Sequence, residues 1–546
     1  MSIFLLKTTA ARFLSASSPR HRALHPIATI STLLSVSSFS FVAPDSLLPH
    51  SCASPYSSSA AMAAQSNAHL IKLRFDLTPE EITKATESLI EEFNGVLNKI
   101  AAESAPTVDN VIVPAARGEA KFYRQHTEVD FPQYVSTDSK VRDASSEADK
   151  KVSDFLVETS MREDLYKVFK KLEESGGLKN LQGEDLRFAE RNLRDFRRDG
   201  MELPEEKREK LKALLKRLSV LCIDFSKNLN EDTSSITVKR KDLAGLPDDF
   251  VSGLEEVKGQ DESWCTEDKE VIVTCKYPHA FPTLRQCTVE ETRKKMEFAF
   301  SNRCKESNTK IAEEILKLRD EAAKLLGYPT WADYILEIRM AKNTATVRDF
   351  YHNLRPKLEV KGDEELKVLL ELKKEETGDK FDNKINAWDF NYYCQKLLRE
   401  KYGVDEELIK HFFPTDRVVA ETLKIYQELL RLSFEVVPDA PVWQKDVTCY
   451  QVKDSETGEL QGFFYLDLFP RDGKYGHAAV FPLQKGADDE EGKQQYPACA
   501  MLCNFPAATE TTPSFLRHSG KPLFELCCKP CFPSTLINLL RGNSLS

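Results

Sequence analysis

Apolar residues recur at intervals of three and four along most of the chain, which is the spacing of amphipathic α-helices. The clearest run follows Pro204 and has lysines and Arg217 on its opposite face. A second run ends at Gly327, a residue that closes helices in the left-handed conformation. The apolar positions of the first run are Leu211, Leu214, Leu215, Leu218, Leu221, Cys222 and Phe225, and those of the second are Ile311, Ile315, Leu318, Ala322 and Leu325. Such patterns predict a helical body over residues 67–446.

The first helix of this body has a clear start signal in Thr78-Pro79-Glu80-Glu81. Thr78 can cap the helix, Pro79 suits its first position, and Glu81 completes a capping box. The apolar residues Ile82, Leu89, Phe93, Val96 and Ile100 then continue one helical face. A helix is therefore predicted to begin at Pro79.

The pattern changes to two-residue alternation between Val447 and Arg517, which predicts a small antiparallel sheet in residues 447–519. Turn-forming residues separate the segments, most clearly Pro470-Arg471-Asp472-Gly473. A small sheet in a helical protein usually supports a functional site. The predicted strands are Val447–Lys453, Gly462–Phe469, Tyr475–Phe481 and Tyr496–Phe505.

Composition narrows the range of partners. The formal net charge is −10 and no basic face is sustained, which argues against nucleic acid. No run of about 18 apolar residues predicts a membrane span. The 13 cysteines lack the dense spacing of a disulfide scaffold, so we read them as reduced thiols. We expect a monomer.

Residues 1–66 have the composition of an organellar leader. They carry Lys7, Arg12, Arg20 and Arg22 against a single acid, Asp45, and are rich in serine. This predicts a mitochondrial or chloroplast location. Met62 offers an alternative start that would leave a cytoplasmic form.

Several separated motifs resemble the thimet oligopeptidase and neurolysin family of zinc metalloendopeptidases. The strongest are Phe464-Tyr-Leu-Asp-Leu-Phe-Pro-Arg-Asp-Gly-Lys-Tyr-Gly-His-Ala478 and Ala500-Met-Leu-Cys-Asn-Phe505, and Leu326–Lys342 and Ala387–Tyr393 also match in order. The resemblance covers roughly Leu77–Ser519. It implies a mainly α, elongated two-lobed body with a deep channel, a zinc cofactor, and short peptides as substrates.

The family's zinc motif is not found in this sequence. Members continue into a helix with His-Glu-Phe-Gly-His, whose two histidines bind one ion while the glutamate takes a proton from water. The ten histidines include one pair four residues apart, His21 and His25, with Arg22 in place of the base. The match stops after Ser519, and residues 520–546 look like out-of-frame translation. We therefore expect an incomplete catalytic lobe, exposed apolar patches, no bound zinc and no catalytic residues. The alternative is a non-enzymatic peptide-binding or regulatory fragment.

Two further groups of residues are poor candidates for a metal site. Cys527, Cys528 and Cys531 with His518 can be drawn as a metal site, but adjacent cysteines chelate one ion poorly. The remaining histidines, His126 among them, are scattered and are expected to be solvated or locally hydrogen-bonded. The sequence therefore predicts no metal ligand.

Substrate-binding residues follow from the resemblance. It implies that Ala500–Phe505 forms an exposed strand edge, to which an extended peptide adds by main-chain hydrogen bonds. The candidate substrate-binding residues are Tyr475, Gly476, His477, Met501 and Asn504. Two alternatives stay open: these residues only pack the sheet, or His477 holds its turn by a hydrogen bond.

Overall fold

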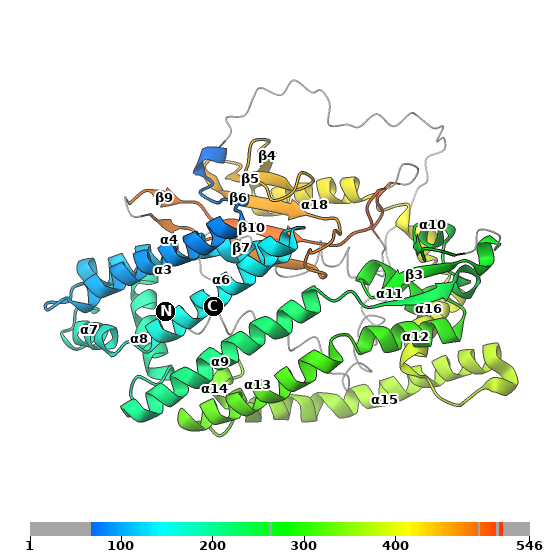
Figure 1. The fold of residues 1–546 in the computed structure, drawn as a ribbon, viewed down its shortest axis with the longest axis horizontal. Coiled ribbons are helices and arrows are strands. Elements are labelled where there is room, and N and C mark those ends of the chain that lie inside the picture. Colours follow the sequence, from blue (N-terminus) through cyan, green and yellow to red (C-terminus); the bar gives the residue numbers. More distant parts are fainter. Residues whose placement is uncertain (1–66, 261–264, 490–491, 509–512, 517–546) are drawn as a thin grey trace.

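A computed structural model describes residues 67–260, 265–489, 492–508 and 513–516 (Figure 1). The predicted leader and the tail, with His518 and the three tail cysteines, lie outside these residues. The described chain is mainly α-helical, as predicted. None of its helices has the length and hydropathy that a membrane span requires.

The first group of helices packs around one large apolar core. Its first helix, α3, has the predicted capping box: the Thr78 hydroxyl accepts the Glu81 N–H at 3.2 Å, and the Glu81 carboxylate accepts the Thr78 N–H at 2.9 Å. Ile82 and Phe93 of α3 share the core with Leu211 of α9. The group comprises α3 (Pro79–Ala101), α4 (Val113–Asp130), α6 (Ser139–Ser160), α7 (Glu163–Glu174), α8 (Gly183–Arg198), α9 (Glu205–Asn230), α13 (Lys305–Leu325) and α14 (Trp331–Leu336). The short helix α5 (Pro132–Val135), between α4 and α6, belongs to a different core.

A second, smaller core forms around a three-stranded antiparallel sheet, at the right in Figure 1. Its strand order is β1-β3-β2, and Ile236, Val238, Val271 and Val273 alternate toward the core. This part of the chain was predicted to be helical, so these short strands were missed. The elements here are β1 (Ser235–Lys239), β2 (Glu255–Glu256), β3 (Glu270–Thr274), α10 (Asp248–Ser252), α11 (Tyr277–Gln286), α12 (Glu290–Ser301), α15 (Thr344–Thr377), α16 (Ala387–Tyr402) and α17 (Glu406–Lys410).

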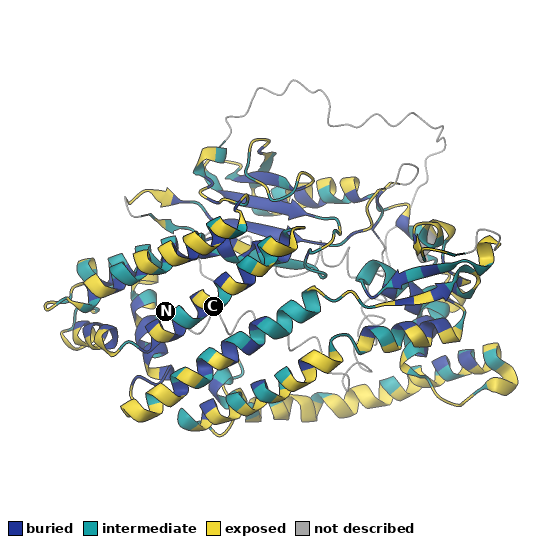
Figure 2. Cartoon of the chain, viewed as in Figure 1, coloured by how far each residue is buried: buried dark blue, intermediate teal, exposed yellow. Residues whose placement is uncertain are grey.

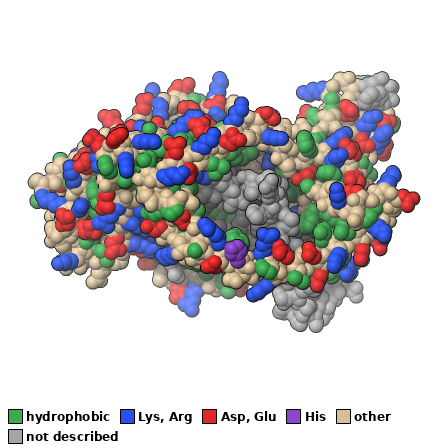
Figure 3. All heavy atoms as spheres, turned by 90° about the horizontal axis from the view of Figure 1, so that it is seen from below, with side chains coloured by type: hydrophobic (Ala, Val, Ile, Leu, Met, Phe, Trp, Pro, Cys, Tyr) green, Lys and Arg blue, Asp and Glu red, His purple; other side chains and the backbone are tan. Residues whose placement is uncertain are grey.

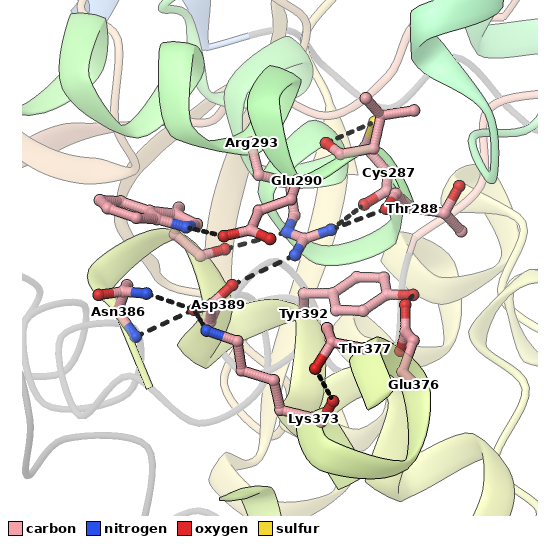
Figure 4. A network of polar contacts seen from close by, with 12 residues as sticks. Cys287, Thr288, Glu290, Arg293, Lys373, Glu376, Thr377, Asn386, Asp389 and Tyr392 are labelled. Atoms are coloured by element: carbon pink, nitrogen blue, oxygen red, sulfur yellow. Dashed lines mark hydrogen bonds and ion pairs between the residues drawn. The ribbon is translucent and has the colours of Figure 1, made fainter. Parts of the chain in front are cut away.

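A buried ionic network joins α12, α15 and α16 (Figure 4). The Asp389 side chain, fully buried, accepts from Arg293 at 3.2 Å and from Lys373 at 2.8 Å. Lys373 also binds Asp382 at 2.8 Å, and the Arg293 guanidinium lies 4.0 Å from the centre of the Tyr392 ring. One carboxylate thus holds α16 to its neighbour in sequence, α15, and to the more distant α12.

The larger sheet lies above the long helices in Figure 1 and has the order β4-β5-β6-β10-β7. It is antiparallel except for β6 and β10, which run parallel, so the prediction of a purely antiparallel sheet was wrong on this point. The helix α18 and two short strands, β8 and β9, belong to this region. The bounds are α18 (Thr415–Leu430), β4 (Leu432–Val436), β5 (Thr448–Asp454), β6 (Leu460–Asp467), β7 (Ala479–Gln484), β8 (Ala487–Asp488), β9 (Gln494–Gln495) and β10 (Ala498–Leu502).

Both faces of this sheet are covered, which makes β6 buried along nearly its whole length. Phe464 and Leu466 face a core that includes Tyr426 of α18, whereas Phe463 and Tyr465 face a core that includes residues of α5. A strand covered on both faces has a continuous rather than an alternating apolar sequence. This explains why the motif around β6 is so apolar.

Helix α15 has few buried residues, as the exposed colours along it show (Figure 2). Of its 34 residues, Leu369 and Lys373 are buried. Phe350, Tyr351 and Val360 are each more than 60% exposed. This helix therefore presents several large apolar side chains on the surface of the described chain.

Candidate functional site

The segment between β6 and β7 starts from a fully buried carboxylate, Asp467, at the end of β6. Asp467 accepts from both terminal nitrogens of Arg471, at 2.8 and 2.7 Å, and from Lys474 Nζ at 2.6 Å. The Trp443 indole N–H donates to it at 2.8 Å. The two oxygens therefore receive four donors. Asp467 is the centre around which the loop 468–478 is built.

Lys474 holds the loop together by hydrogen bonds from its buried side chain. Its side chain is fully buried, and Nζ donates to the carbonyls of Phe469 and Cys503, both at 2.6 Å, as well as to Asp467. Charged ammonium groups are buried only when they are paired and hydrogen-bonded. Lys474 thus ties the start of the loop to the end of β10.

The outside of the loop rests on the N-terminal helices. Arg471 donates to the Val135 carbonyl at 3.1 and 3.2 Å, and the Tyr475 N–H donates to the Tyr134 carbonyl at 2.8 Å. Gly473 has φ +76°, and a Cβ there would lie 2.5 Å from the Ser136 carbonyl oxygen. Because other residues would both be strained and clash, the Asp-Gly turn predicted from the sequence needs its glycine at this point.

The structure brings three of the predicted substrate-binding residues, Tyr475, Gly476 and His477, together on this loop. A Cβ built at Gly476 would have no atom of the described residues within 4 Å, so this part of the backbone borders space that they leave open. The His477 ring lies 5.0 Å from that of Tyr277, at 88°, and its Nδ1 accepts the Ala478 N–H at 2.8 Å. His477 therefore both holds its own turn and contacts α11.

The other two predicted substrate-binding residues, Met501 and Asn504, lie outside this loop. The Met501 side chain is 3% exposed and belongs to the core beneath α18, which is the packing role named above as one of the alternatives. Asn504 donates from its side-chain amide to the carbonyls of Tyr475 and His477, at 3.0 and 3.2 Å. Asn504 braces the candidate loop from below, a supporting role that the sequence did not indicate.

The strand edge implied by the resemblance was also misplaced. β10 pairs with β6 on one side and with β7 on the other, so it is an interior strand. Within the described chain, β7 is an outer strand of this sheet and directly follows His477. Pro482 on β7 lacks an N–H donor, which suits an outer strand.

Electrostatics keep the loop's central carboxylate ionised. Burial acts to raise the pKa of Asp467, but hydrogen bonds and charges from Arg471 and Lys474 outweigh it, and the pKa lies below its usual value. Burial lowers the pKa of Lys474, and Asp467 acts in the opposite direction. Four oxygens lie within hydrogen-bonding distance of Lys474 Nζ and share its three N–H groups, and the charge of Asp467 among them favours the ammonium form.

Asp467 and Lys474 were not singled out in the sequence, although a signal was present. Asp467 interrupts a run of apolar residues on β6, and Arg471 and Lys474 follow it at four and seven residues. An acid inside a buried strand needs partners, and the nearest cations in the chain are its partners here.

An arginine-lined cavity of about 440 Å³ lies elsewhere, between α8 and the start of the segment after α14. Its arginines already have partners: Arg194 binds Asp195, Arg197 binds Glu173, and Arg198 donates to the Tyr334 carbonyl and contacts Glu337. The cavity therefore offers little unbalanced positive charge to an anionic ligand.

Within the described ranges, one group of three potential metal ligands lies close enough for a single ion: His126, Asp130 and Asp149. The group lies on α4 and α6 and contains a single histidine. It therefore does not fit the zinc site of the family that the sequence resembles, which uses two histidines one helical turn apart.

Comparisons with known proteins agree with the resemblance. Residues 283–520 match peptidase family M3, and residues 86–208 match the N-terminal domain of neurolysin and thimet oligopeptidase. The chain is 37% identical to a thimet-like oligopeptidase of Dictyostelium discoideum over 82% of its own length and 68% of that relative. It is 34% identical to saccharolysin of Saccharomyces cerevisiae, over 82% of its own length and 64% of that relative. It is 30% identical to a probable thimet oligopeptidase of Arabidopsis thaliana, over 79% of its own length and 59% of that relative.

The chain thus spans about three fifths to two thirds of the length of these relatives. On the face shown in Figure 3, the described atoms leave a recess between the two ends of the molecule. The resemblance implies a channel in a two-lobed body, and that channel stays a prediction.

Proposed function

The chain belongs to peptidase family M3, the family of the thimet oligopeptidases, and on this premise we propose that the segment Tyr475–His477 and strand β7 help to form a binding groove for short peptides. The observation that carries the proposal is the open space at Gly476, on a loop whose position is fixed from both sides. A rigid loop with an accessible backbone can bind a peptide main chain without first being ordered.

Strand β7 supplies the second part of the proposed groove. An extended peptide can pair with the outer strand of a sheet and take main-chain hydrogen bonds from it. Ala479, Val480 and Phe481 are half-buried, and they follow the loop without a break. A peptide that runs along β7 would therefore pass His477 and Gly476 in turn.

We further propose that the polypeptide of this sequence does not hydrolyse the peptides it binds. The family is zinc-dependent, and a zinc ion in such enzymes polarises the scissile carbonyl and activates a water molecule. The printed sequence contains no His-Glu-x-x-His, and the group His126, Asp130 and Asp149 has no glutamate beside a histidine pair. Peptide binding without turnover is the function that these residues support.

Two measurements on the full chain test this proposal. A quenched fluorescent peptide of eight to ten residues, with Zn²⁺ added, should show no cleavage, and turnover that a chelator abolishes would contradict the second part. Fluorescence anisotropy with a labelled, uncleaved peptide should show binding. The first part fails if no peptide from a mixed-sequence set binds.

A matched pair of glycine substitutions tests whether the peptide binds at the loop. Gly476→Val adds a side chain where a peptide would lie, and Gly95→Val adds the same side chain on α3, where there is also open space. We expect Gly476→Val to weaken peptide binding at least tenfold and Gly95→Val to leave it within twofold. Equal effects of the two variants on peptide binding would show that the peptide does not bind at the loop.

We also propose that residues 1–66 direct the protein to an organelle, since their composition is that of a transit peptide. A fluorescent protein fused after residue 66 should enter mitochondria or chloroplasts, whereas a fusion that starts at Met62 should stay in the cytoplasm. A diffuse signal from both fusions would contradict the proposal.

A further inference from the structure

Three side chains that can bind a metal ion, one histidine and two aspartates, meet where α4 and α6 pack together. His126 and Asp130 lie one turn apart near the end of α4, and Asp149 lies on the neighbouring α6. One ligand atom from each lies within 4.8 Å of the other two. The sequence suggested a solvated or locally hydrogen-bonded His126, and the structure corrects this.

His126 is 8% exposed, and its Nε2 makes no hydrogen bond within the described part of the chain. The Asp149 carboxylate oxygen is 3.8 Å from Nε2, too far for a hydrogen bond. Phe122 stacks on the imidazole, with ring centres 6.1 Å apart and planes at 23°, and so restrains the ring. A buried nitrogen without a partner typically costs about 1–3 kcal/mol.

The spacing is too long for hydrogen bonds but suits a shared ion. Ligand atoms that lie about 2.0–2.2 Å from one cation are separated from each other by roughly 3–4 Å. The 3.8 Å between His126 and Asp149 falls in this range. An ion between them would give the buried nitrogen the partner it lacks.

The charges around the site also favour a cation. Two carboxylates, Asp130 and Asp149, face one imidazole, and no ion pair between either of them and a lysine or arginine is present among the described residues. Gln133 donates its amide to Asp130, and the nearby Lys150 binds Glu147 and Asp224 instead. Among the described residues, the imidazole of His126 is thus the one basic side chain paired with these two carboxylates.

We propose that His126, Asp130 and Asp149 bind one divalent transition-metal cation that links α4 to α6. One imidazole and two carboxylates suit Mn²⁺, Fe²⁺ or Zn²⁺ and leave the remaining positions to water. The set is distinct from a zinc site with two histidines on one helix. The inference does not depend on the peptide-binding proposal.

Such an ion would support the candidate loop from a distance. The short helix α5 follows Asp130 directly, and the carbonyls of Tyr134 and Val135 on α5 accept from Tyr475 and Arg471. The Ser145 hydroxyl on α6 also holds the end of α4 through the Asp130 carbonyl, at 2.9 Å. A cation at this junction would fix the surface on which the loop rests.

Manganese is the most selective probe for this site. Zn²⁺ would also bind thiolates, and the chain has 13 cysteines, whereas Mn²⁺ prefers oxygen and imidazole ligands. Titration of the full chain with MnCl₂, with free Mn²⁺ measured by electron paramagnetic resonance, should show one bound ion per chain.

Three variants locate the ion. His126→Gln and Asp149→Asn each remove one ligand and should weaken Mn²⁺ binding at least tenfold. Glu147→Gln is the matched control, because Glu147 is on the same helix but binds Lys150 at 3.0 Å, and it should bind Mn²⁺ as the unmodified chain does. Circular dichroism checks the fold of each variant, and if Asp149→Asn does not fold, His126→Gln decides.

Crystals soaked in MnCl₂ give a test that is independent of the variants. The anomalous difference map should contain a peak within about 2.0–2.3 Å of ligand atoms of His126, Asp130 and Asp149. No Mn²⁺ binding by the unmodified chain, equal binding by the two ligand variants, or a peak only elsewhere would overturn the proposal.

Discussion

Two buried ionic clusters in this protein use the same three residue types but are built in different ways. In the larger sheet, Asp467 binds Arg471 and Lys474, which follow it by four and seven residues. In the helical part, Asp389 binds Arg293 and Lys373, which are 96 and 16 residues away in the sequence. One cluster shapes a single loop, and the other joins three helices.

The difference in sequence separation between the two clusters indicates a different structural role for each buried carboxylate. Replacing a buried ion pair by apolar residues is often neutral for stability, whereas removing one partner is costly. The local cluster holds Tyr475–His477 in position, and so its loss should affect ligand binding. The long-range cluster fixes packing, and so its loss should affect stability throughout the second core. Substitutions in each cluster should separate the two roles.

Lys474→Met should have the largest effect. It leaves the carbonyls of Phe469 and Cys503 without their donor and removes one cation from Asp467. Breaking a buried pair in this way costs about 3–5 kcal/mol. Urea unfolding should show that loss, and limited proteolysis should cut within residues 468–478 before global unfolding. The control Lys424→Met, at a lysine whose side chain is 64% exposed, should change the free energy of unfolding by less than about 0.5 kcal/mol.

Lys373→Met should cost somewhat less, about 2–4 kcal/mol, because Asp389 keeps Arg293 and the Asn386 donors. The loss of protection should appear in the helices around Asp389 and not in the loop 468–478. Hydrogen exchange should rise in α12, α15 and α16, and peptide binding to the loop should stay within twofold of the unmodified chain. Protection lost mainly in residues 468–478 would contradict the division of roles.

The same contrast explains what could be read from the sequence. The helix start at Pro79 was predictable because its capping box lies within four residues. The Asp-Gly turn was predictable for the same reason, and Gly473 has the φ it requires. Partners near in sequence leave a local pattern.

The errors concern partners distant in sequence. β10 was taken for an edge because nothing in Ala498–Leu502 tells that β7, an earlier strand, pairs on its other side. Likewise, nothing near Asp389 points to Arg293. The resemblance made Asn504 a candidate substrate-binding residue, and nothing in the sequence indicated its acceptors, the carbonyls of Tyr475 and His477, which lie 27 to 29 residues away. Tertiary contacts of this kind are not encoded in any short stretch.

Gly473→Ala tests the geometry of the loop without changing its charges. A left-handed φ of +76° and a contact with the Ser136 carbonyl should together destabilise the protein by about 1–3 kcal/mol. Thermal unfolding measures the loss. Gly458→Ala, at φ +75° with no atom within 4 Å of the added methyl, is the control for φ alone. If both variants lose the same stability, the contact between the loop and Ser136 contributes nothing.

Asn504→Ala should cost about 1–2 kcal/mol, because two hydrogen bonds to loop carbonyls are lost and the carbonyls can be partly solvated. Peptide binding should weaken along with stability, since the loop loses its brace. Asn504→Asp is the informative companion: it keeps the size of the side chain but replaces the donor by an acceptor. An Asn504→Asp variant that binds peptide like the unmodified chain would exclude the bracing role.

The smallest effect concerns the exposed end of the helical cluster. Lys373 and Asn386 lower the pKa of Asp382 to about 2, below the usual value of about 3.9 in unfolded chains. A lowered pKa means that the unfolded state binds more protons, so this contribution is full above pH 4 and disappears as the pH falls through 2. Because Asp382 is largely exposed, its pair with Lys373 should contribute no more than about 1 kcal/mol. Asp382→Asn should therefore lower the free energy of unfolding at pH 6 by that amount at most, and the difference from the unmodified chain should shrink between pH 4 and pH 3. A difference that stays constant down to pH 3 would show that the asparagine disturbs packing and that the charge itself contributes nothing.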